Sequence, residues 1–170
     1  MLNELSDGSR FCIRHIRPDD KQLLADALER LSPEMAYRRF LSPKPSFSSG
    51  ELRYLTELDG HDHVAIVAIP ADDPTYLAGV ARFVRLEDDP ETAEAAIVVG
   101  DPFQGRGLGK LLALRLADEA AQRGIRRFTA TILGQNVPAQ RLMSAIAERL
   151  DRGPLAGSAR ELSVELPQAA

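Results

Sequence analysis

Apolar side chains along this chain recur with two different spacings, which predict both strands and helices. Unbroken or alternating apolar runs bounded by Pro, Gly or Asp predict strands at residues 10–17, 64–69, 76–86, 93–99, 127–133 and 161–166. Stripes at three- and four-residue spacing predict helices from about residue 19 to 31 and at 34–40, 49–58, 108–123 and 136–150. This order of elements predicts an α/β protein in which a mixed sheet carries helices on both faces.

Several helix ends and one strand carry local signals. Ser32 followed by Pro33 is a typical helix start, and Asn136 is a candidate N-cap for the last helix. Gly124 is expected to end the helix that begins at residue 108. Gly79 lies inside an apolar run, so it indicates a bulge or a close approach of another element.

Composition narrows the class of protein. The chain has 170 residues, of which 44% are hydrophobic and 27% charged, and this predicts one globular domain spanning residues 1–170. The net charge is −4 and the Lys and Arg residues are scattered, which argues against nucleic acid as a partner. We find no apolar run near the ~20 residues that cross a membrane and no apolar core of a signal peptide, so a cytoplasmic protein is expected.

Two features that often carry chemistry have simpler explanations here. Cys12 is the single cysteine and stands between Phe11 and Ile13 in a predicted strand, which favours a small buried thiol over a nucleophile. His61 and His63 would point to the same face of a strand, but the sequence offers no clear third ligand. We therefore predict no metal site.

The stretch from Ile97 to Lys110 is the strongest functional signal. Three apolar β-branched residues predict a buried strand, and a Pro/Gly turn leads from it into a helix. Gly105, Gly107 and Gly109 allow close approach of a ligand and positive φ angles. The first amides of a helix lack intrahelical partners and lie at the positive end of its dipole, so this junction is suited to a phosphate group.

The glycine spacing excludes two common nucleotide-binding loops. A dinucleotide fingerprint would require glycine at Lys110 or at Leu112, depending on where it starts. A P-loop would require glycine at Gln104 and Ser or Thr at Leu111. The loop must therefore bind another kind of phosphate ligand, or it is a glycine-rich turn that binds nothing.

The pattern Gln104-x-x-Gly107-x-Gly109 resembles the acyl-CoA pyrophosphate loop of the GNAT superfamily of N-acetyltransferases. The chain is similar to the acetyltransferase domain of bacterial protein lysine acetyltransferases in further blocks: Asp7-Gly8, Ile13-Arg14-x-Ile16-Arg17-Pro18-x-Asp20, Leu31-Ser32-Pro33-Glu34-x-x-Tyr37-x-Arg39-Phe40, and Ala93-Glu94-x-Ala96 ahead of Asp101-x-x-Gln104-Gly105-Arg106. The resemblance covers about residues 10–166. It implies the GNAT fold, with a mixed, mostly antiparallel central sheet of about six to seven strands.

The resemblance also implies a cofactor and the residues around it. Acetyl-CoA would be the co-substrate, no metal would be needed, and the pantetheine arm would lie between two parallel strands that splay apart, 93–99 and 127–133. The residues at the matching positions are Val99, Gln104, Gly105, Arg106, Gly107, Leu108, Gly109, Lys110 and Asn136. Two alternatives stay open: Asn136 could be an N-cap and no more, and Arg106 and Lys110 could face solvent.

Acetyl transfer to an amine requires the neutral amine, because an ammonium has no lone pair for attack. Glu94 matches the segment that carries the presumed general base in the family, and burial would raise its pKa toward a useful value. The alternative is an exposed glutamate at the start of a strand. A backbone amide near Val99 would hold the oxyanion. Met143 stands where many members have a tyrosine that reprotonates the thiolate, so Ser144, a water or no group at all would replace it.

Two functions follow as hypotheses. The first is an enzyme that transfers an acetyl or short acyl group from acyl-CoA to a primary amine, either a small molecule or a protein lysine, with Glu94 as the base. The second is a regulatory or scaffold module that binds acyl-CoA without turnover, which the methionine at position 143 favours.

Overall fold

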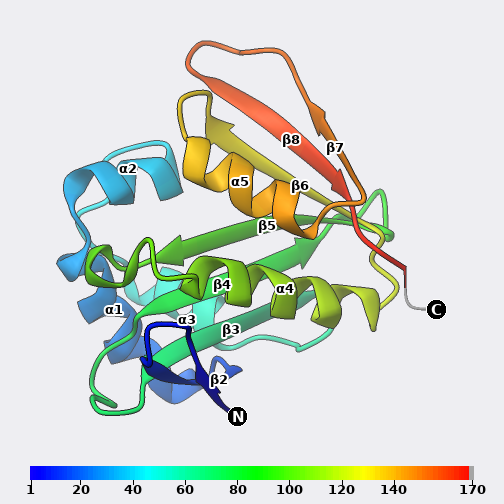
Figure 1. The fold of residues 1–170 in the computed structure, drawn as a ribbon. Coiled ribbons are helices and arrows are strands. Elements are labelled where there is room, and N and C mark those ends of the chain that lie inside the picture. Colours follow the sequence, from blue (N-terminus) through cyan, green and yellow to red (C-terminus); the bar gives the residue numbers. More distant parts are fainter. Residues whose placement is uncertain (169–170) are drawn as a thin grey trace.

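The computed structural model describes residues 1–168, and its centre is one eight-stranded sheet (Figure 1). The strands lie in the order β1-β2-β3-β4-β5-β6-β8-β7. Their bounds are β1 Leu2–Glu4, β2 Arg10–His15, β3 His63–Pro70, β4 Gly79–Arg85, β5 Thr92–Val99, β6 Arg127–Leu133, β7 Arg149–Arg152 and β8 Ala159–Glu165. Neighbouring strands are antiparallel except β5 and β6, which are parallel. The predicted mixed, mostly antiparallel sheet is confirmed.

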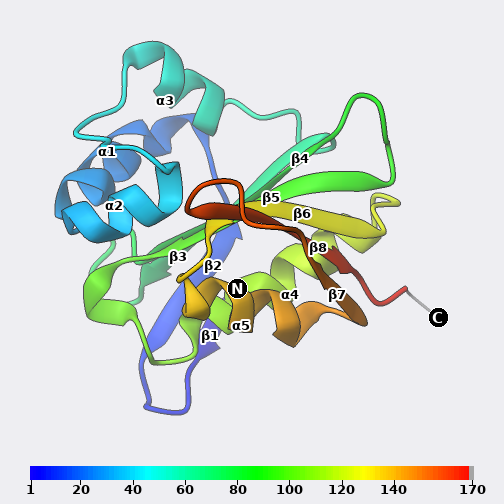
Figure 2. The ribbon, with the colours of Figure 1, turned by 90° about the horizontal axis from the view of Figure 1, so that it is seen from above.

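Helices cover both faces of this sheet, as predicted (Figure 2). On one side lie α1 (Lys21–Arg30), α2 (Pro33–Phe40) and α3 (Ser49–Thr56), and on the other lie α4 (Leu108–Ala121) and α5 (Val137–Ile146). Each side has its own apolar cluster, one around Leu24 and Val67 and a larger one around Leu112 and Phe83. Strand β3 is buried along its whole length because it contributes to both clusters.

The predicted caps form. The Ser32 hydroxyl accepts a hydrogen bond from the Met35 amide at 3.3 Å, with Pro33 as the first residue of α2. The Asn136 side-chain oxygen accepts one from the Ala139 amide at 3.3 Å and caps α5. Gly124 adopts a φ of 77° just after α4. These contacts satisfy amides that would otherwise lack a partner at the helix starts.

The sheet has more strands than predicted because each edge carries a short strand that the sequence pattern does not indicate. The last helix ends at Ile146 and does not reach residue 150, since Ala147 has an extended backbone and Arg149–Arg152 pairs with β8. At the other edge, Leu2–Glu4 pairs with β2. Both edge strands are short and mostly exposed, so neither shows an alternating apolar pattern in the sequence.

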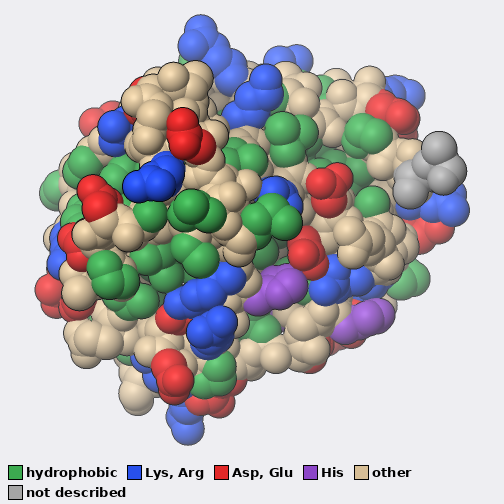
Figure 3. All heavy atoms as spheres, turned by 60° about the horizontal axis from the view of Figure 1, so that its bottom comes forward, with side chains coloured by type: hydrophobic (Ala, Val, Ile, Leu, Met, Phe, Trp, Pro, Cys, Tyr) green, Lys and Arg blue, Asp and Glu red, His purple; other side chains and the backbone are tan. Residues whose placement is uncertain are grey.

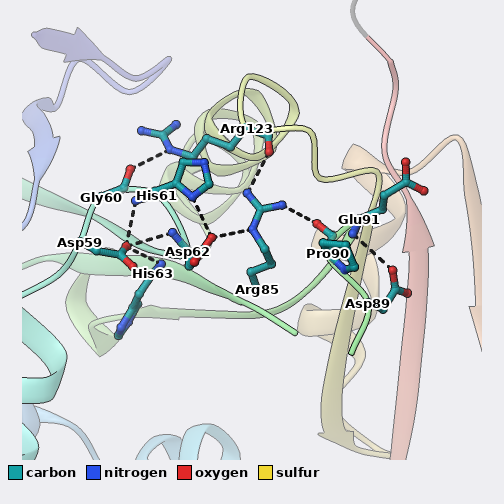
Figure 4. Close-up of polar contacts among 10 residues, drawn as sticks. All are labelled: Asp59, Gly60, His61, Asp62, His63, Arg85, Asp89, Pro90, Glu91 and Arg123. Carbon is teal, nitrogen blue, oxygen red and sulfur yellow. Dashed lines mark hydrogen bonds and ion pairs between the residues drawn. The ribbon is translucent and has the colours of Figure 1, made fainter. Parts of the chain in front are cut away.

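A polar network joins the hairpin between β4 and β5 to the end of α4 (Figure 4). The Arg85 guanidinium contacts the Asp62 carboxylate at 2.8 Å, the Arg123 carbonyl at 2.8 Å, and the Pro90 carbonyl. Arg123 in turn donates to the Gly60 carbonyl at 2.8 Å. These contacts fix the loop that leads into β5.

The face of the molecule shown in Figure 3 carries side chains of both charges and no large patch of a single sign. In Figure 3, Lys and Arg side chains are interspersed with Asp and Glu. Within residues 1–168, no cluster of three or more His, Cys, Asp or Glu side chains is arranged to hold a metal. Across the same residues we find no helix with both the length and the apolar character that crossing a bilayer requires. Cys12 is half-buried on β2 rather than fully buried.

Gly79 provides a test of the packing between the sheet and α4. A Cβ at this position would lie 2.8 Å from Leu112 Cδ1 and 3.2 Å from the Val98 carbonyl oxygen, so the predicted close approach is confirmed. We expect Gly79→Ala to lower the free energy of unfolding by about 1–3 kcal/mol through overpacking. Denaturant unfolding measures this change.

Gly50→Ala is the matched control. Gly50 lies in α3, where a Cβ would meet only the Ser48 hydroxyl at 4.0 Å. We expect this variant to be more stable than wild type by about 0.5–1 kcal/mol, because alanine loses less backbone freedom in a helix. A Gly79→Ala protein as stable as the Gly50→Ala protein would contradict the packing argument.

Candidate active site

Strands β5 and β6 separate soon after they begin, and the separation creates the site. They pair only from Thr92 to Glu94 on β5 and from Arg127 to Thr129 on β6. Beyond this point they diverge like the arms of a V, open on the side where α2 lies (Figure 1). The edges that face each other in the V have no strand between them, so backbone groups there are available to a ligand.

The backbone of Val99 is directed into this opening. The Gly100 amide donates to the Ala78 carbonyl at 2.8 Å on the β4 side. Successive residues of a strand present their amides to alternate edges, so the Val99 amide points toward the gap. The Gln104 side-chain amide donates to the Val99 carbonyl at 3.0 Å. Gln104 therefore ties the loop to the end of β5 and leaves the Val99 amide as the available donor.

The glycine loop has the predicted positive φ angles at Gly105 and Gly107, whereas Gly109 lies inside α4 and does not adopt one. Gly105 and Gly107 adopt φ values of 72° and 92°, which side chains with a Cβ rarely tolerate. Gly107 is the N-cap of α4 and provides no side chain to cap the first amides. At Gly109, a Cβ would lie 3.3 Å from Leu142, so this glycine lets α5 pack closely against α4. The start of a 14-residue helix is thus exposed to an anion.

A cleft of about 410 Å³ lies beside this loop, and we call it the loop cleft. Residues from the end of β5, the loop, α5 and α2 line it: Met35, Arg38, Arg39, Ile97, Val98, Val99, Phe103, Gln104, Gly105, Gly107, Gly109, Lys110, Asn136, Pro138, Ala139, Arg141 and Leu142. Seven of the nine residues predicted to contact the cofactor are in this set. Asn136 caps α5 and also lines the loop cleft, so a role as N-cap is compatible with a role in cofactor binding.

The other two predicted cofactor residues, Leu108 and Arg106, lie outside the lining. The Leu108 side chain is completely buried in the core, so only its backbone amide is positioned for a ligand. The Arg106 guanidinium contacts the Asp7 carboxylate at 2.7 Å. Hydrogen bonds from Ser9 and the contact with Arg106 lower the pKa of Asp7 to about 2. The turn before β2 thus holds the Arg106 side chain, a contact that sequence analysis missed.

A second cavity of about 240 Å³ lies between the diverging strands, and we call it the strand gap. Glu94 from β5, Thr131 from β6, Asn136 and Met143 from the α5 region, and Arg39 from α2 are among its lining residues. Six residues line both this gap and the loop cleft: Arg38, Arg39, Ile97, Asn136, Ala139 and Leu142. A ligand bound by the glycine loop could therefore extend toward Glu94.

Glu94 lies in the gap as predicted, but its surroundings differ from the expectation. Its side chain is exposed rather than buried, because β6 diverges from β5 directly after this residue. Met143 is buried and lines the gap, so a thioether occupies this position. Ser144 is exposed and does not line the gap, so it is wrongly placed to replace the missing tyrosine.

Helix α2 is tied to the loop by a contact that the sequence did not reveal. The Asp101 carboxylate, just after β5, accepts hydrogen bonds from the Ser32 amide at 2.9 Å and the Ser32 hydroxyl at 3.1 Å. Ser32 is the N-cap of α2, and the last turn of α2 carries Arg38 and Arg39. Asp101 therefore links the glycine loop to the helix that closes one side of the strand gap.

A buried polar group lies next to the gap, on the face of the sheet that α3 covers. Arg82 in β4 is 7% exposed, and its Nη1 donates to the Leu55 carbonyl at 3.2 Å and to His63 Nε2 at 3.1 Å. Burial and the neighbouring Arg82 lower the pKa of His63 to about 4. His63 therefore accepts a hydrogen bond as the neutral ring.

The fold, the glycine loop and the split strands define a class of protein. The model of the acetyltransferase (GNAT) family matches residues 24–145, so this chain belongs to that family. The chain is 33% identical over 143 residues to acetyltransferase Pat of Mycolicibacterium smegmatis; the match covers 84% of this chain and 42% of Pat. The chain thus spans less than half of that relative's length.

Solved structures agree with this assignment. The GNAT domain of PAT from S. lividans is 28% identical, with a TM-score of 0.86 over 98% of this chain and 96% of that domain. The yncA protein of Salmonella typhimurium was solved with its cofactor acetyl-CoA and is 19% identical to this chain. Its TM-score is 0.74 over 94% of this chain and 96% of yncA. At this identity the likeness supports the fold alone. The predicted GNAT fold is confirmed.

The shifted pKa of His63 makes stability depend on pH. In the folded protein the ring stays neutral down to about pH 4, whereas in the unfolded chain it binds a proton near its ordinary value of 6.5. The contribution of His63 is complete above pH 6.5 and is lost as the pH falls toward 4. We expect wild type to lose on the order of 1 kcal/mol more per pH unit than His63→Gln across this window.

Urea unfolding at pH 7.0, 6.0 and 5.0 measures the effect. Glutamine keeps an acceptor for Arg82 but does not titrate. The difference between the two proteins isolates His63 from His15 and His61, which both proteins retain. Parallel pH profiles for wild type and variant would contradict the prediction.

Proposed function

We propose that this chain transfers an acetyl or short acyl group from acyl-CoA to a primary amine. The observation that carries the proposal is that the loop cleft and the strand gap share lining residues, and that Glu94 lines the strand gap. Membership of the acetyltransferase (GNAT) family supports acyl-CoA as the donor.

In this proposal the loop binds the diphosphate of coenzyme A. The unpartnered first amides of α4 and the positive-φ glycines 105 and 107 would donate to phosphate oxygens, and Lys110 would add a charge. The pantetheine arm would pair with the open edge of β5. The thioester carbonyl would then lie near the Val99 amide, which would donate to the oxyanion of the tetrahedral intermediate.

Glu94 is proposed as the general base. The acceptor amine must lose a proton to attack the thioester, and Glu94 is the carboxylate that lines the strand gap. Its exposure allows direct proton transfer or transfer through a water. The thiolate leaves without a tyrosine, because Met143 occupies that position; a thiolate needs little help since the pKa of a thiol is near 8.5.

A protein lysine is the acceptor class favoured by the sequence motifs, which resemble those of bacterial protein lysine acetyltransferases. A lysine side chain is long and narrow enough to enter a gap between strands from the α2 side. Small primary amines remain the other acceptor class.

One observation favours a second function. Met143 provides no acid for the leaving thiolate, so a module that binds acyl-CoA without turnover is the alternative. The two functions differ in one measurement: the enzyme releases coenzyme A thiol when an amine is added, and the module binds acetyl-CoA but releases none with any acceptor.

Glu94→Gln tests the proposed base. We expect kcat/KM for the acceptor to fall by about 10² or more, because a general base contributes about 10²–10⁴ to the rate. Affinity for acetyl-CoA should change less than about twofold, since the side chain lies away from the loop. A thiol-release assay and calorimetry measure the two effects.

Glu91→Gln is the matched control, because Glu91 is also exposed and lies three residues earlier, outside both cavities. It should retain wild-type turnover. Full turnover by Glu94→Gln would exclude Glu94 as the base but would leave acyl transfer itself intact.

Gly107→Ala tests the loop. The alanine would have to adopt a φ of 92° at the N-cap of α4, so we expect the loop to change shape and the dissociation constant of acetyl-CoA to rise by about tenfold. Gly124→Ala imposes similar strain, at a φ of 77°, at the other end of the same helix. This variant should be less stable than wild type, but its affinity for acetyl-CoA should be unchanged. Equal affinity losses in the two variants would show that the loop has no special role.

A further inference from the structure

Arg39 and Arg82 line the same cavity beside the strand gap, and neither forms an ion pair within residues 1–168. The Arg82 side chain is 7% exposed and bonds only to neutral acceptors, the Leu55 carbonyl and His63. The Arg39 guanidinium lies 4.8 Å from the ring centre of Phe40. Within residues 1–168, neither arginine has a carboxylate oxygen within 4.0 Å.

This arrangement is costly for the protein alone. Burial lowers the pKa of Arg39, and burial together with Arg39 lowers the pKa of Arg82 to about 10. Arg82 nevertheless stays protonated near neutral pH, so a buried charge lies near the half-buried charge of Arg39. Buried charges are normally paired, because an unpaired one loses its hydration without compensation.

Both arginines line a third cavity of about 60 Å³, which we call the arginine cavity. Its other walls are mainly apolar and come from α1, the α2–α3 region and strands β4 and β5, including Leu24, Leu28, Phe40, Phe47 and Val80. None of the loop residues 104–110 lines it, although Arg39 and Val98 line both this cavity and the loop cleft. Arg39, Phe40 and Ala96 line both this cavity and the strand gap.

Glu94 lies on the same side of the sheet as the arginine cavity. Arg82 pairs with Ala96, and Val84 pairs with Glu94, so Arg82 and Glu94 are diagonal neighbours on one face. Glu94 is close enough to Arg39 to oppose the lowering of its pKa, but the two make no ion pair. A molecule between them would meet a base at one end and two guanidinium groups at the other.

We propose that Arg39 and Arg82 bind a carboxylate of the acceptor, so that the preferred acceptors are primary amines that also carry a carboxylate on a short aliphatic stem. This inference rests on the proposed acyl transfer, because it places the acceptor amine at Glu94. Guanidinium groups suit carboxylates, since both are planar and form charge-assisted hydrogen bonds. The carboxylate could belong to a free amino acid or to an acidic residue close to a lysine in a protein.

Matched acceptors test the proposal. Thiol release from acetyl-CoA is measured with ω-amino carboxylates of increasing length and with their carboxamides, and in a second arm with lysine peptides that carry either Glu or Gln beside the lysine. We expect kcat/KM to favour the carboxylate over its neutral partner by about tenfold or more in at least one arm. The arm with the larger ratio identifies the source of the carboxylate.

Two variants test whether the arginines cause the preference for carboxylate-bearing acceptors. Arg82→Met and Arg39→Gln should each bring the carboxylate-to-carboxamide ratio close to one, whereas Arg53→Gln, on the exposed side of α3, should leave the ratio unchanged. Thermal melting and acetyl-CoA binding check that each variant folds, and Arg39→Gln suffices if Arg82→Met does not. A ratio near one in wild type, or a ratio unaffected by the folded variants, overturns the proposal.

A binding measurement separates this inference from the proposed function. Calorimetry with the N-acetylated products, in the presence of coenzyme A, compares carboxylate and carboxamide without turnover. Preferential binding of the carboxylate that is lost in Arg39→Gln supports the anion site even if no thiol is released. Equal binding of the carboxylate and the carboxamide, or no binding of either, overturns the proposed anion site. Thiol release with neutral amines would still support acyl transfer in that case.

Discussion

The divergence of β5 from β6 is the constraint on which the rest of the site depends. Two parallel strands normally use all the hydrogen bonds along their facing edges. Here the pairing stops after Glu94 and Thr129, and the remaining backbone of β5 faces an opening. The alternation of the strand then directs the Val99 amide into the gap, and the same strand runs on into the glycine loop.

The opening is maintained by rigid neighbours on both sides. β6 pairs with β8 along seven residues, and β5 pairs with β4 along seven residues, so each arm belongs to a stable part of the sheet. Helix α5 packs against the start of α4 through Leu142, and Gly109 permits the contact. Because each arm is held from outside, the gap need not close when no ligand is bound.

The sequence predicts the six inner strands, all five helices and seven of the seventeen residues that line the loop cleft, because these follow from local signals. Apolar periodicity, caps and glycine spacing act within a few residues, and Gly105 and Gly107 adopt the expected positive φ angles. The two edge strands were missed, since short exposed strands have no apolar pattern and are selected by their partners.

The interactions missed at the site all join residues distant in the chain. Asp101 contacts Ser32 across 69 residues, and Arg106 contacts Asp7 across 99 residues. The burial of Arg82 depends on α3 and β3, which pack over it only in the folded protein. Likewise, the exposure of Glu94 follows from the point at which the strands separate, which neither strand encodes alone.

The placement of charge also explains how the two halves of the site can differ in chemistry. The loop cleft offers the first backbone amides of α4, and such amides suit a phosphate through their dipoles without a counter-charge. The opposite side offers the Glu94 carboxylate and the Arg82 guanidinium from one face of the sheet, together with the Arg39 guanidinium from α2. Asp101, in the turn that begins the loop, bonds to the N-cap of α2, so the position of Arg39 depends on that turn. A change in that turn would therefore alter both halves together.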